Sequence, residues 1–396
     1  MEQLLSQRIN HAQPSFIREV LKVAGQPGII SFAGGLPNPA LFPVAALKEA
    51  TAAILDEEGE AALQYTSTEG NAELRAWIAE RYRVRQGVQI DPASILITNG
   101  SQQALDLLGK VLLDAGDGVV LEEPGYLGAI QALTLYQPQF MPVPLDDDGI
   151  IVDELRRVLG AGRPKLLYTV PNFQNPSGIS YSDERRREVA ALLSGRDMLL
   201  IEDNPYGELR FSGEGPVSFM QLLPEQTVLL GSFSKVVAPS LRLGWIVAPP
   251  WLMRKLVIAK QAADLHTNGF AQRVLYRYLR DNDINRHLAA ITEVYGRQMH
   301  AMLQAIARHF PDGVRTTTPQ GGMFLWATLP PQLSALRLFE AAIAEQVAFV
   351  PGHPFYVGRH DSNTLRLNYT NANEATIAQG IERLGRVMAE QLERSG

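Results

Sequence analysis

The sequence predicts an α/β protein, with a large domain built on a mostly parallel sheet sandwiched by helices and a smaller α+β C-terminal domain. Two observations carry this prediction. Before about residue 270, short apolar, β-rich runs alternate with amphipathic helical segments, which is the pattern of a parallel sheet with helical crossovers. From about Asp281 that rhythm changes, and 396 residues with 46% hydrophobic content can fill two cores.

The individual elements follow from these runs. The expected strands are 95–98, 118–121, 165–170, 198–201, 227–230 and 242–247, with helices such as 101–114 and 182–193 between them. Further on we expect a helix at 284–309, a strand at 322–328, a helix at 335–346, a strand at 364–368 and a closing helix from Asn373. With an ordered Gly- and Pro-rich arm at the start, the expected divisions are 1–44, 45–280 and 281–396.

Composition excludes several classes of function. The chain has 36 basic and 42 acidic residues, a net charge of −6, and no basic stripe that could neutralise a row of phosphates, so no nucleic-acid partner is expected. The absence of cysteine excludes disulfides, thiolate catalysis and cysteine-based zinc sites. Without a long apolar run or a signal peptide, we expect a cytoplasmic enzyme with no membrane span.

Other potential signals have ordinary explanations. The seven histidines lack metal-ligand spacing, so no metal site is expected. The run Arg185–Arg187 follows Ser182-Asp183-Glu184, which marks a helix start, and we interpret the arginines as a solvated face. Phosphate-binding and hydrolase motifs of the common glycine-rich kinds are absent.

One lysine occupies an unusual place. Lys235 lies in a small, hydroxyl-rich loop directly after the expected strand 227–230, with Ser232 and Ser234 beside it. Alone, an exposed loop lysine would explain it equally well. Arg242, expected at the start of the next strand, favours a cofactor-binding role for Lys235. Two hydroxyls, a guanidinium and an amine together suit a phosphate-bearing aldehyde.

Three more segments suit the same ligand. Residues 98–103 form a strand end, a glycine and a helix start whose free N–H groups could accept a phosphate, although a plain helix cap is the alternative. Asp203 closes an expected strand and could hold a proton on a pyridine nitrogen, worth about 4 kcal/mol at ~4 Å and an effective dielectric of ~20. Residues 170–178 are either an Asn-Pro turn or an amide reaching the phenolic oxygen of the ring.

Taken in their order along the chain, the sequence motifs resemble those of the class I (fold type I) aminotransferases, and more narrowly those of the 2-aminoadipate aminotransferase and kynurenine aminotransferase II-like group. The resemblance runs from about Phe16 to Ile381. It is carried by Ser31-Phe32-Ala33-Gly34-Gly35-Leu36-Pro37, Gln64-Tyr65-Thr66-Ser67-Thr68-Glu69-Gly70, Gly100-Ser101-Gln102-Gln103, Asn175-Pro176-Ser177-Gly178, Asp203-Asn204-Pro205-Tyr206, Ser232-Phe233-Ser234-Lys235 and Leu365-Arg366-Leu367. Asn-Pro-Ser-Gly replaces the commoner Asn-Pro-Thr-Gly, and Asn204 stands where a second acid is frequent.

The resemblance implies pyridoxal 5'-phosphate as cofactor and assigns the catalytic roles. Lys235 would hold the cofactor covalently and later move a proton between the substrate Cα and the cofactor. Asp203 would pair with the pyridinium nitrogen, while Asn175 and Tyr206 would hydrogen-bond the phenolic oxygen of the ring. The residues expected to bind the cofactor are Tyr65, Gly100, Ser101, Gln102, Tyr126, Asn175, Asp203, Tyr206, Ser232, Ser234, Lys235 and Arg242.

The resemblance also implies partners and substrates. Tyr126 would stack on the ring, and Tyr65 would reach the phosphate of a partner subunit, giving a homodimer with shared active sites. Arg366 would bind the substrate α-carboxylate, near Asn175 and Gly35. The arm would carry a helix that closes over the substrate, with Arg18 either recognising an acidic side chain or lying solvated.

The expected reaction is a ping-pong transfer from 2-aminoadipate, glutamate, aromatic or large aliphatic amino acids to a 2-oxo acid, commonly 2-oxoglutarate. One alternative is a fold type I lyase or decarboxylase, which would keep Lys235 and Asp203 but release another group from Cα. The other is a non-catalytic effector-binding domain of a transcription regulator, which would need a helix-turn-helix domain for which the chain has no room before Phe16.

Overall fold

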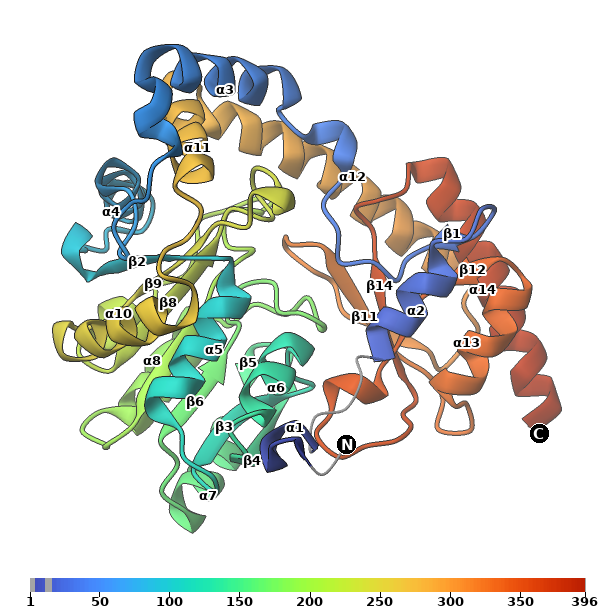
Figure 1. Cartoon of the computed structure of the whole chain (residues 1–396). Helices are drawn as coiled ribbons and strands as arrows, with labels where there is room; N and C mark the ends of the chain where they lie inside the picture. Colours follow the sequence, from blue (N-terminus) through green and yellow to red (C-terminus); the bar gives the residue numbers. More distant parts are fainter. Residues whose placement is uncertain (1–3, 11–15, 396) are drawn as a thin grey trace.

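The computed structural model describes residues 4–10 and 16–395. Its larger part is built around an eight-stranded sheet of order β2-β9-β8-β7-β6-β3-β4-β5 (Figure 1). The central strands β8, β7, β6, β3 and β4 are parallel, whereas β9 is antiparallel to both its neighbours and β5 is antiparallel to β4. The strands are β2 Ile95–Thr98, β3 Gly118–Glu123, β4 Gln139–Asp146, β5 Gly149–Ile150, β6 Leu166–Thr169, β7 Leu199–Asp203, β8 Thr227–Ser232 and β9 Gly244–Val247.

Alternating residues of the central strands fill two separate cores. Leu166 and Tyr168 of β6 belong to the large core, while Leu167 between them belongs to a smaller core on the opposite face. Because successive side chains of a strand point to opposite faces, a sheet with cores on both sides needs nearly continuous apolar strands. The helices of this part are α3 Val44–Glu58, α4 Ala72–Gln86, α5 Ser101–Leu112, α6 Leu127–Thr134, α7 Val152–Ala161, α8 Asp183–Leu193, α9 Phe219–Leu222, α10 Pro250–Asp264 and α11 Gly269–Asp281.

The long helix α12 (Ile284–His309) leads from this part to the C-terminal part (Figure 1). There an antiparallel sheet of order β10-β11-β14-β13 is accompanied by two helices. Its elements are β10 Arg315–Thr316, β11 Phe324–Thr328, α13 Ala335–Ala344, β12 Val347–Ala348, β13 Val350–Pro351, β14 Thr364–Asn368 and α14 Glu374–Ser395. Asn373 accepts a hydrogen bond from the Thr376 N–H, so the closing helix is capped where the sequence predicts.

The N-terminal arm is attached to the C-terminal part. Strand β1 (Ile30–Ser31) pairs in parallel with β12, and helix α2 (Phe16–Ala24) lies beside it (Figure 1). A short helix, α1 (Gln7–Asn10), precedes α2. Short 3-10 helices complete the chain at Pro39–Leu41, Gly59–Leu63, Pro92–Ser94, Pro239–Leu241 and His353–Phe355.

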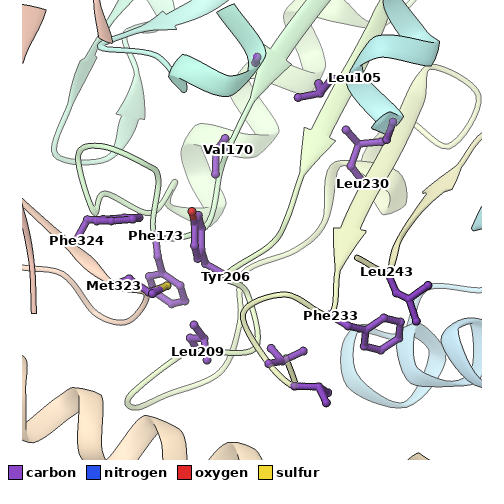
Figure 2. Packing of buried hydrophobic residues seen from close by; sticks show 14 of the residues in the cluster. Leu105, Val170, Phe173, Tyr206, Leu209, Leu230, Phe233, Leu243, Met323 and Phe324 are labelled. Carbon is purple, nitrogen blue, oxygen red and sulfur yellow. The ribbon is translucent and has the colours of Figure 1, made fainter. Parts of the chain in front are cut away.

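The two parts share one hydrophobic core. Met323 and Phe324, from the C-terminal part, pack beside Phe173, Tyr206 and Leu209 from the loops of the large sheet (Figure 2). Loops that carry predicted site residues therefore rest directly on the C-terminal part. Among the described residues, no helix has the length and apolar character needed to span a membrane.

All of the expected strands form, but the sequence did not predict β4 or the two-residue strands β1, β5, β10, β12 and β13, and some bounds were wrong. Strand β4 was missed because Pro142 and Pro144 lower its strand propensity; those residues pair only with β3, and proline is tolerated where no second strand needs its N–H. Helices α5 and α13 end two residues earlier than expected. Arg242 does not open a strand, because its φ of 53° is left-handed and β9 begins at Gly244.

The arginine run Arg185–Arg187 was also misjudged in part. Arg187 is exposed, but the Arg186 side chain is fully buried and donates hydrogen bonds to the carbonyl oxygen of Pro171 at 2.8 Å and to Asn172 Oδ1 at 2.8 Å. It also lies 3.7 Å from Glu202. The helix start at Ser182 is confirmed, since the Ser182 hydroxyl accepts from the Arg185 N–H.

Candidate active site

The predicted site residues converge on one cavity of about 480 Å³ at the carboxyl ends of the parallel strands. It is lined by Gly35, Gly100, Ser101, Gln102, Tyr126, Asn175, Asp203, Tyr206, Ser232, Ser234, Lys235, Arg242 and Arg366, together with residues that the sequence did not single out. Two predicted residues lie elsewhere. Arg18 is exposed on α2, and Tyr65 is 78% exposed, with its ring against that of His266 at 5.7 Å between centroids.

Lys235 is the lysine best suited to act as a nucleophile. Of the seven lysines only Lys235 and Lys260 are not exposed. Lys260 is held by Asp264 at 2.6 Å, whereas the Lys235 amine donates only to the backbone carbonyl of Gly35, at 2.8 Å. Burial and the charges of Arg366 and Arg242 lower the pKa of Lys235 to about 8. About one tenth of this amine is therefore uncharged at pH 7, against less than about 0.1% for an ordinary lysine, and the uncharged form is the one that imine formation requires.

Asp203 is the last residue of β7, and only one of its two carboxylate oxygens accepts a hydrogen bond. The Tyr168 hydroxyl donates to Asp203 Oδ2 at 2.7 Å, while Oδ1 is buried without a partner. Burial raises the pKa of Asp203 to about 7, against the lowering effect of the Tyr168 hydrogen bond. A buried carboxylate oxygen without a donor, at the wall of a cavity, fits the charged N–H of a pyridinium ring.

Arg366, in the middle of β14, is placed for a carboxylate. Its guanidinium donates to Asn175 Oδ1 at 2.7 Å and to the Ala33 carbonyl at 2.8 Å, and its Nε is buried without a partner. The rings of Phe324 and Phe355 lie 4.3 and 5.2 Å from it. Burial lowers the pKa of Arg366 to about 10, so the group stays charged at neutral pH and lacks a counter-ion that a substrate carboxylate could supply.

A separate corner of the cavity fits a phosphate. Helix α5 begins after Gly100 with no side-chain cap, which leaves its first N–H groups directed at the cavity wall formed by Ser101 and Gln102. A Cβ on Gly100 would lie 2.7 Å from the Arg242 guanidinium, so only glycine permits this approach. The left-handed backbone of Arg242 turns its side chain back to this corner, next to Ser232 and Ser234.

The loop that carries Asn175 is anchored by a buried acid that the sequence analysis missed. Glu122 Oε1 accepts from the Thr169 hydroxyl at 2.5 Å, the Val170 N–H at 3.0 Å and the Tyr181 hydroxyl at 2.8 Å, and Oε2 accepts from Gln174 at 2.9 Å. Glu122 and Tyr168 could have been suspected only as polar residues within otherwise apolar strands. Their partners lie too far away in sequence to be inferred from the chain.

Comparison with known proteins agrees with this geometry. The family model for aminotransferase class I and II matches residues 34–384. A 2-aminoadipate transaminase of Thermus thermophilus is 47% identical over 380 residues, 95% of this chain and 94% of that protein. Aromatic-amino-acid aminotransferase 1 of Thermococcus litoralis is 43% identical over 400 residues, 99% of this chain and 96% of that protein.

The fold agrees as well. The solved structure of the alpha-aminoadipate aminotransferase LysN of Thermus thermophilus, complexed with N-(5'-phosphopyridoxyl)-L-leucine, has a TM-score of 0.92, 44% identity and 99% coverage of both chains. Its ligand joins an amino acid to the cofactor whose groups the cavity fits. The chain therefore belongs to the class I and II aminotransferases and is a pyridoxal-phosphate-dependent enzyme, similar to the 2-aminoadipate, kynurenine and aromatic aminotransferases.

Proposed function

We propose that the enzyme transfers the α-amino group of 2-aminoadipate, glutamate, aromatic or large aliphatic amino acids to a 2-oxo acid, with 2-oxoglutarate as the main acceptor, in a ping-pong cycle. One observation carries the proposal: a free amine at Lys235, an unpartnered carboxylate oxygen at Asp203 and a buried cation at Arg366 line the same cavity. An amino donor needs a base for its α-proton, a site for its carboxylate and a means to stabilise the electrons left behind.

Pyridoxal phosphate, when bound, supplies a cationic ring that delocalises the electron pair left at Cα. Side chains of this protein would perform the remaining steps. The Lys235 amine would hold the cofactor covalently and, as a base of lowered pKa, would take the proton from the substrate Cα. Asp203 keeps the ring nitrogen protonated through its free Oδ1. Asn175 and Tyr206, 3.5 Å apart, are assigned to the phenolic oxygen, and Tyr126 to the face of the ring.

The phosphate is assigned to the corner formed by the start of α5 and the loop after β8. Its ligands would be the N–H groups and side chains of Ser101 and Gln102, the hydroxyls of Ser232 and Ser234, and Arg242. Gly100 allows the backbone to approach. These contacts would fix the ring relative to Lys235.

Substrate selection is assigned to Arg366 and the space beside it. The α-carboxylate would meet the free Arg366 Nε, close to Asn175 and Gly35. Leu127 and Gln131 line both this cavity and a neighbouring one of about 880 Å³, whose wall includes Phe16, Phe140 and Tyr356. An apolar space of this size would accept aromatic and large aliphatic side chains.

We assign the recognition of acidic substrate side chains to the N-terminal arm, and we keep the three divisions of the chain expected from the sequence. The arm over 1–44 carries Arg18 on α2, the domain over 45–280 holds the cofactor, and that over 281–396 supplies Arg366. Arg18 is exposed, so contact with an acidic side chain would require α2 to turn or close over the substrate.

We further propose a homodimer with shared active sites. Tyr65 lies outside the cavity of its own chain, in a surface pocket that Phe270 and the exposed Leu63 also line. A tyrosine that is 78% exposed among large apolar side chains is well placed to be covered by a second subunit. There it would reach the phosphate of the partner's cofactor.

A panel of amino donors tests the function. With 2-oxoglutarate present, 2-aminoadipate, leucine and phenylalanine should each yield glutamate, and turnover confined to alanine would refute the broad specificity. With an amino donor alone, the cofactor should convert to its pyridoxamine form, as half of a ping-pong cycle requires. A lyase or decarboxylase would release a different product and leave the pyridoxal form.

A further inference from the structure

The loop at the start of α5 is held from behind by a charge pair that has no role in the proposed reaction. Asp264, the last residue of α10, accepts hydrogen bonds at Oδ2 from Asn99 Nδ2 at 2.6 Å and from Gln103 Nε2 at 2.7 Å. The Lys260 ammonium donates to both of its oxygens, at 2.6 and 2.8 Å. Asp264 is thus connected to residues on both sides of the Gly100-Ser101-Gln102 segment.

These contacts fix the path of the backbone. With its Nε2 committed to Asp264, Gln103 presents Oε1 to the Asn99 N–H, which donates at 2.8 Å. From the cavity side, Arg242 donates to the Asn99 carbonyl at 3.3 Å. Asn99 is therefore held from both sides, and Gly100 has little freedom between Asn99 and the first turn of α5.

The negative charge of Asp264 is neutralised by the adjacent Lys260 ammonium. The Lys260 side chain is 0% exposed, and Asp264 is its ion-pair partner one helical turn away on α10. A carboxylate this close to a phosphate site would repel the dianion unless a cation neutralised it. With Lys260 in place, Asp264 can orient two amide groups without opposing an anion.

Asp264 also ends its helix in an unusual backbone. Leu265, the next residue, has φ 67° and ψ −60°, a conformation that is rare and strained for a side chain other than glycine. Such a turn persists where its surroundings determine it, and Asp264 is held by hydrogen bonds from three different side chains.

We propose that Asp264, neutralised by Lys260, is a positioning residue for the cofactor phosphate: it orients Asn99 and Gln103 so that the first N–H groups of α5 face the phosphate. The proposal rests on the phosphate assignment made above. The alternative role is structural, a staple between α10 and α5 that stabilises the fold without affecting phosphate binding.

Two ligands that differ only in the phosphate separate these roles. The dissociation constants of pyridoxal phosphate and pyridoxal are measured for the cofactor-free protein by absorbance titration, and unfolding is followed in denaturant. In Asp264→Asn, one oxygen and the charge are lost. We expect about 10-fold weaker binding of pyridoxal phosphate, from roughly one misplaced charge-assisted hydrogen bond, and less than about a twofold change for pyridoxal.

A second variant and a control complete the experiment. Asp264→Asn leaves the Lys260 charge buried and unpaired, which threatens folding, so Lys260→Met/Asp264→Asn is measured in parallel and should show the same selective loss. Glu293→Gln removes an exposed ion pair with Arg297 on α12 and should leave both affinities unchanged.

The outcomes distinguish the inference from the proposed function. Equal weakening for both ligands, or lowered stability with no change in either affinity, would overturn the positioning role of Asp264. If the unmodified protein bound pyridoxal phosphate no more tightly than pyridoxal, the phosphate assignment itself would be wrong.

Discussion

Lys235 differs from an ordinary lysine in its proton affinity, and this gives a pH dependence with a definite sign. Its pKa is lowered to about 8 by burial and by Arg366 and Arg242, so the reactive uncharged amine predominates above pH 8. The rate of covalent uptake of pyridoxal phosphate by the cofactor-free enzyme should fall about tenfold per pH unit below that value and level off above it. Stopped-flow absorbance between pH 6 and 10 measures this. A midpoint near 10.5 would contradict the assignment.

Arg366 owes its role to geometry as much as to charge. It already donates to Asn175 and Ala33, and its free Nε remains for a substrate. A lysine cannot make these contacts together. Arg366→Lys should therefore lower kcat/KM for amino donors and for 2-oxoglutarate roughly 30- to 150-fold, which corresponds to a loss of about 2–3 kcal/mol of transition-state stabilisation. Arg297→Lys is the control, because Arg297 is half exposed, bound to Glu293 and outside both cavities. Comparable losses in both variants would mean that general charge, and not the fork, matters.

At the scale of elements, the turn between β2 and α5 depends on one glycine. Gly100 has φ 76° and ψ 169°, a region that only glycine occupies readily, and an added Cβ would contact Arg242 at 2.7 Å. Gly100→Ala should therefore destabilise the protein by about 1–3 kcal/mol and also weaken cofactor binding, since Arg242 must move. Gly116→Ala separates the two effects: its φ is 90°, but no atom lies within 4 Å of the added Cβ. It should cost stability alone, as measured by denaturant unfolding and cofactor titration.

The same turn shows what local sequence can and cannot predict. The apolar run before Thr98 and the glycine after it predict a strand, a turn and a helix start, and all three form where expected. The run around Arg242 favours a strand equally well, yet Arg242 adopts a left-handed backbone because its side chain must reach Gly100, far away in sequence. Arg186 was misjudged for the same reason, since the oxygens that hold it come from other segments.

At the scale of the whole molecule, the large sheet was predictable and the attachment of the arm was not. The central strands are continuous apolar runs, which a parallel sheet buried on both faces requires. By contrast, β1 and β12 are two residues each and pair across more than three hundred positions. Strands so short carry no periodicity from which their pairing could be inferred. That pairing brings the Ala33 carbonyl to Arg366 and Gly35 to the wall of the cavity.

A homodimer with shared sites can be tested by complementation between two inactive subunits. Lys235→Ala removes the anchor and should abolish activity, while Tyr65→Phe should weaken cofactor binding about 10-fold through loss of one charge-assisted hydrogen bond. In a mixed dimer of the two variants, one site would combine Lys235 of one chain with Tyr65 of the other and would be intact. At a cofactor concentration that leaves the Tyr65→Phe dimer largely empty, dissociating and reassociating an equal mixture should restore activity toward about one quarter of that of the unmodified enzyme, because half of the dimers would be mixed and each would have one intact site. If each site were complete within one chain, the mixture would show only the summed activity of the two parent variants. Native mass spectrometry, which separates the mixed dimer from both parent dimers by mass, would establish whether mixed dimers had formed.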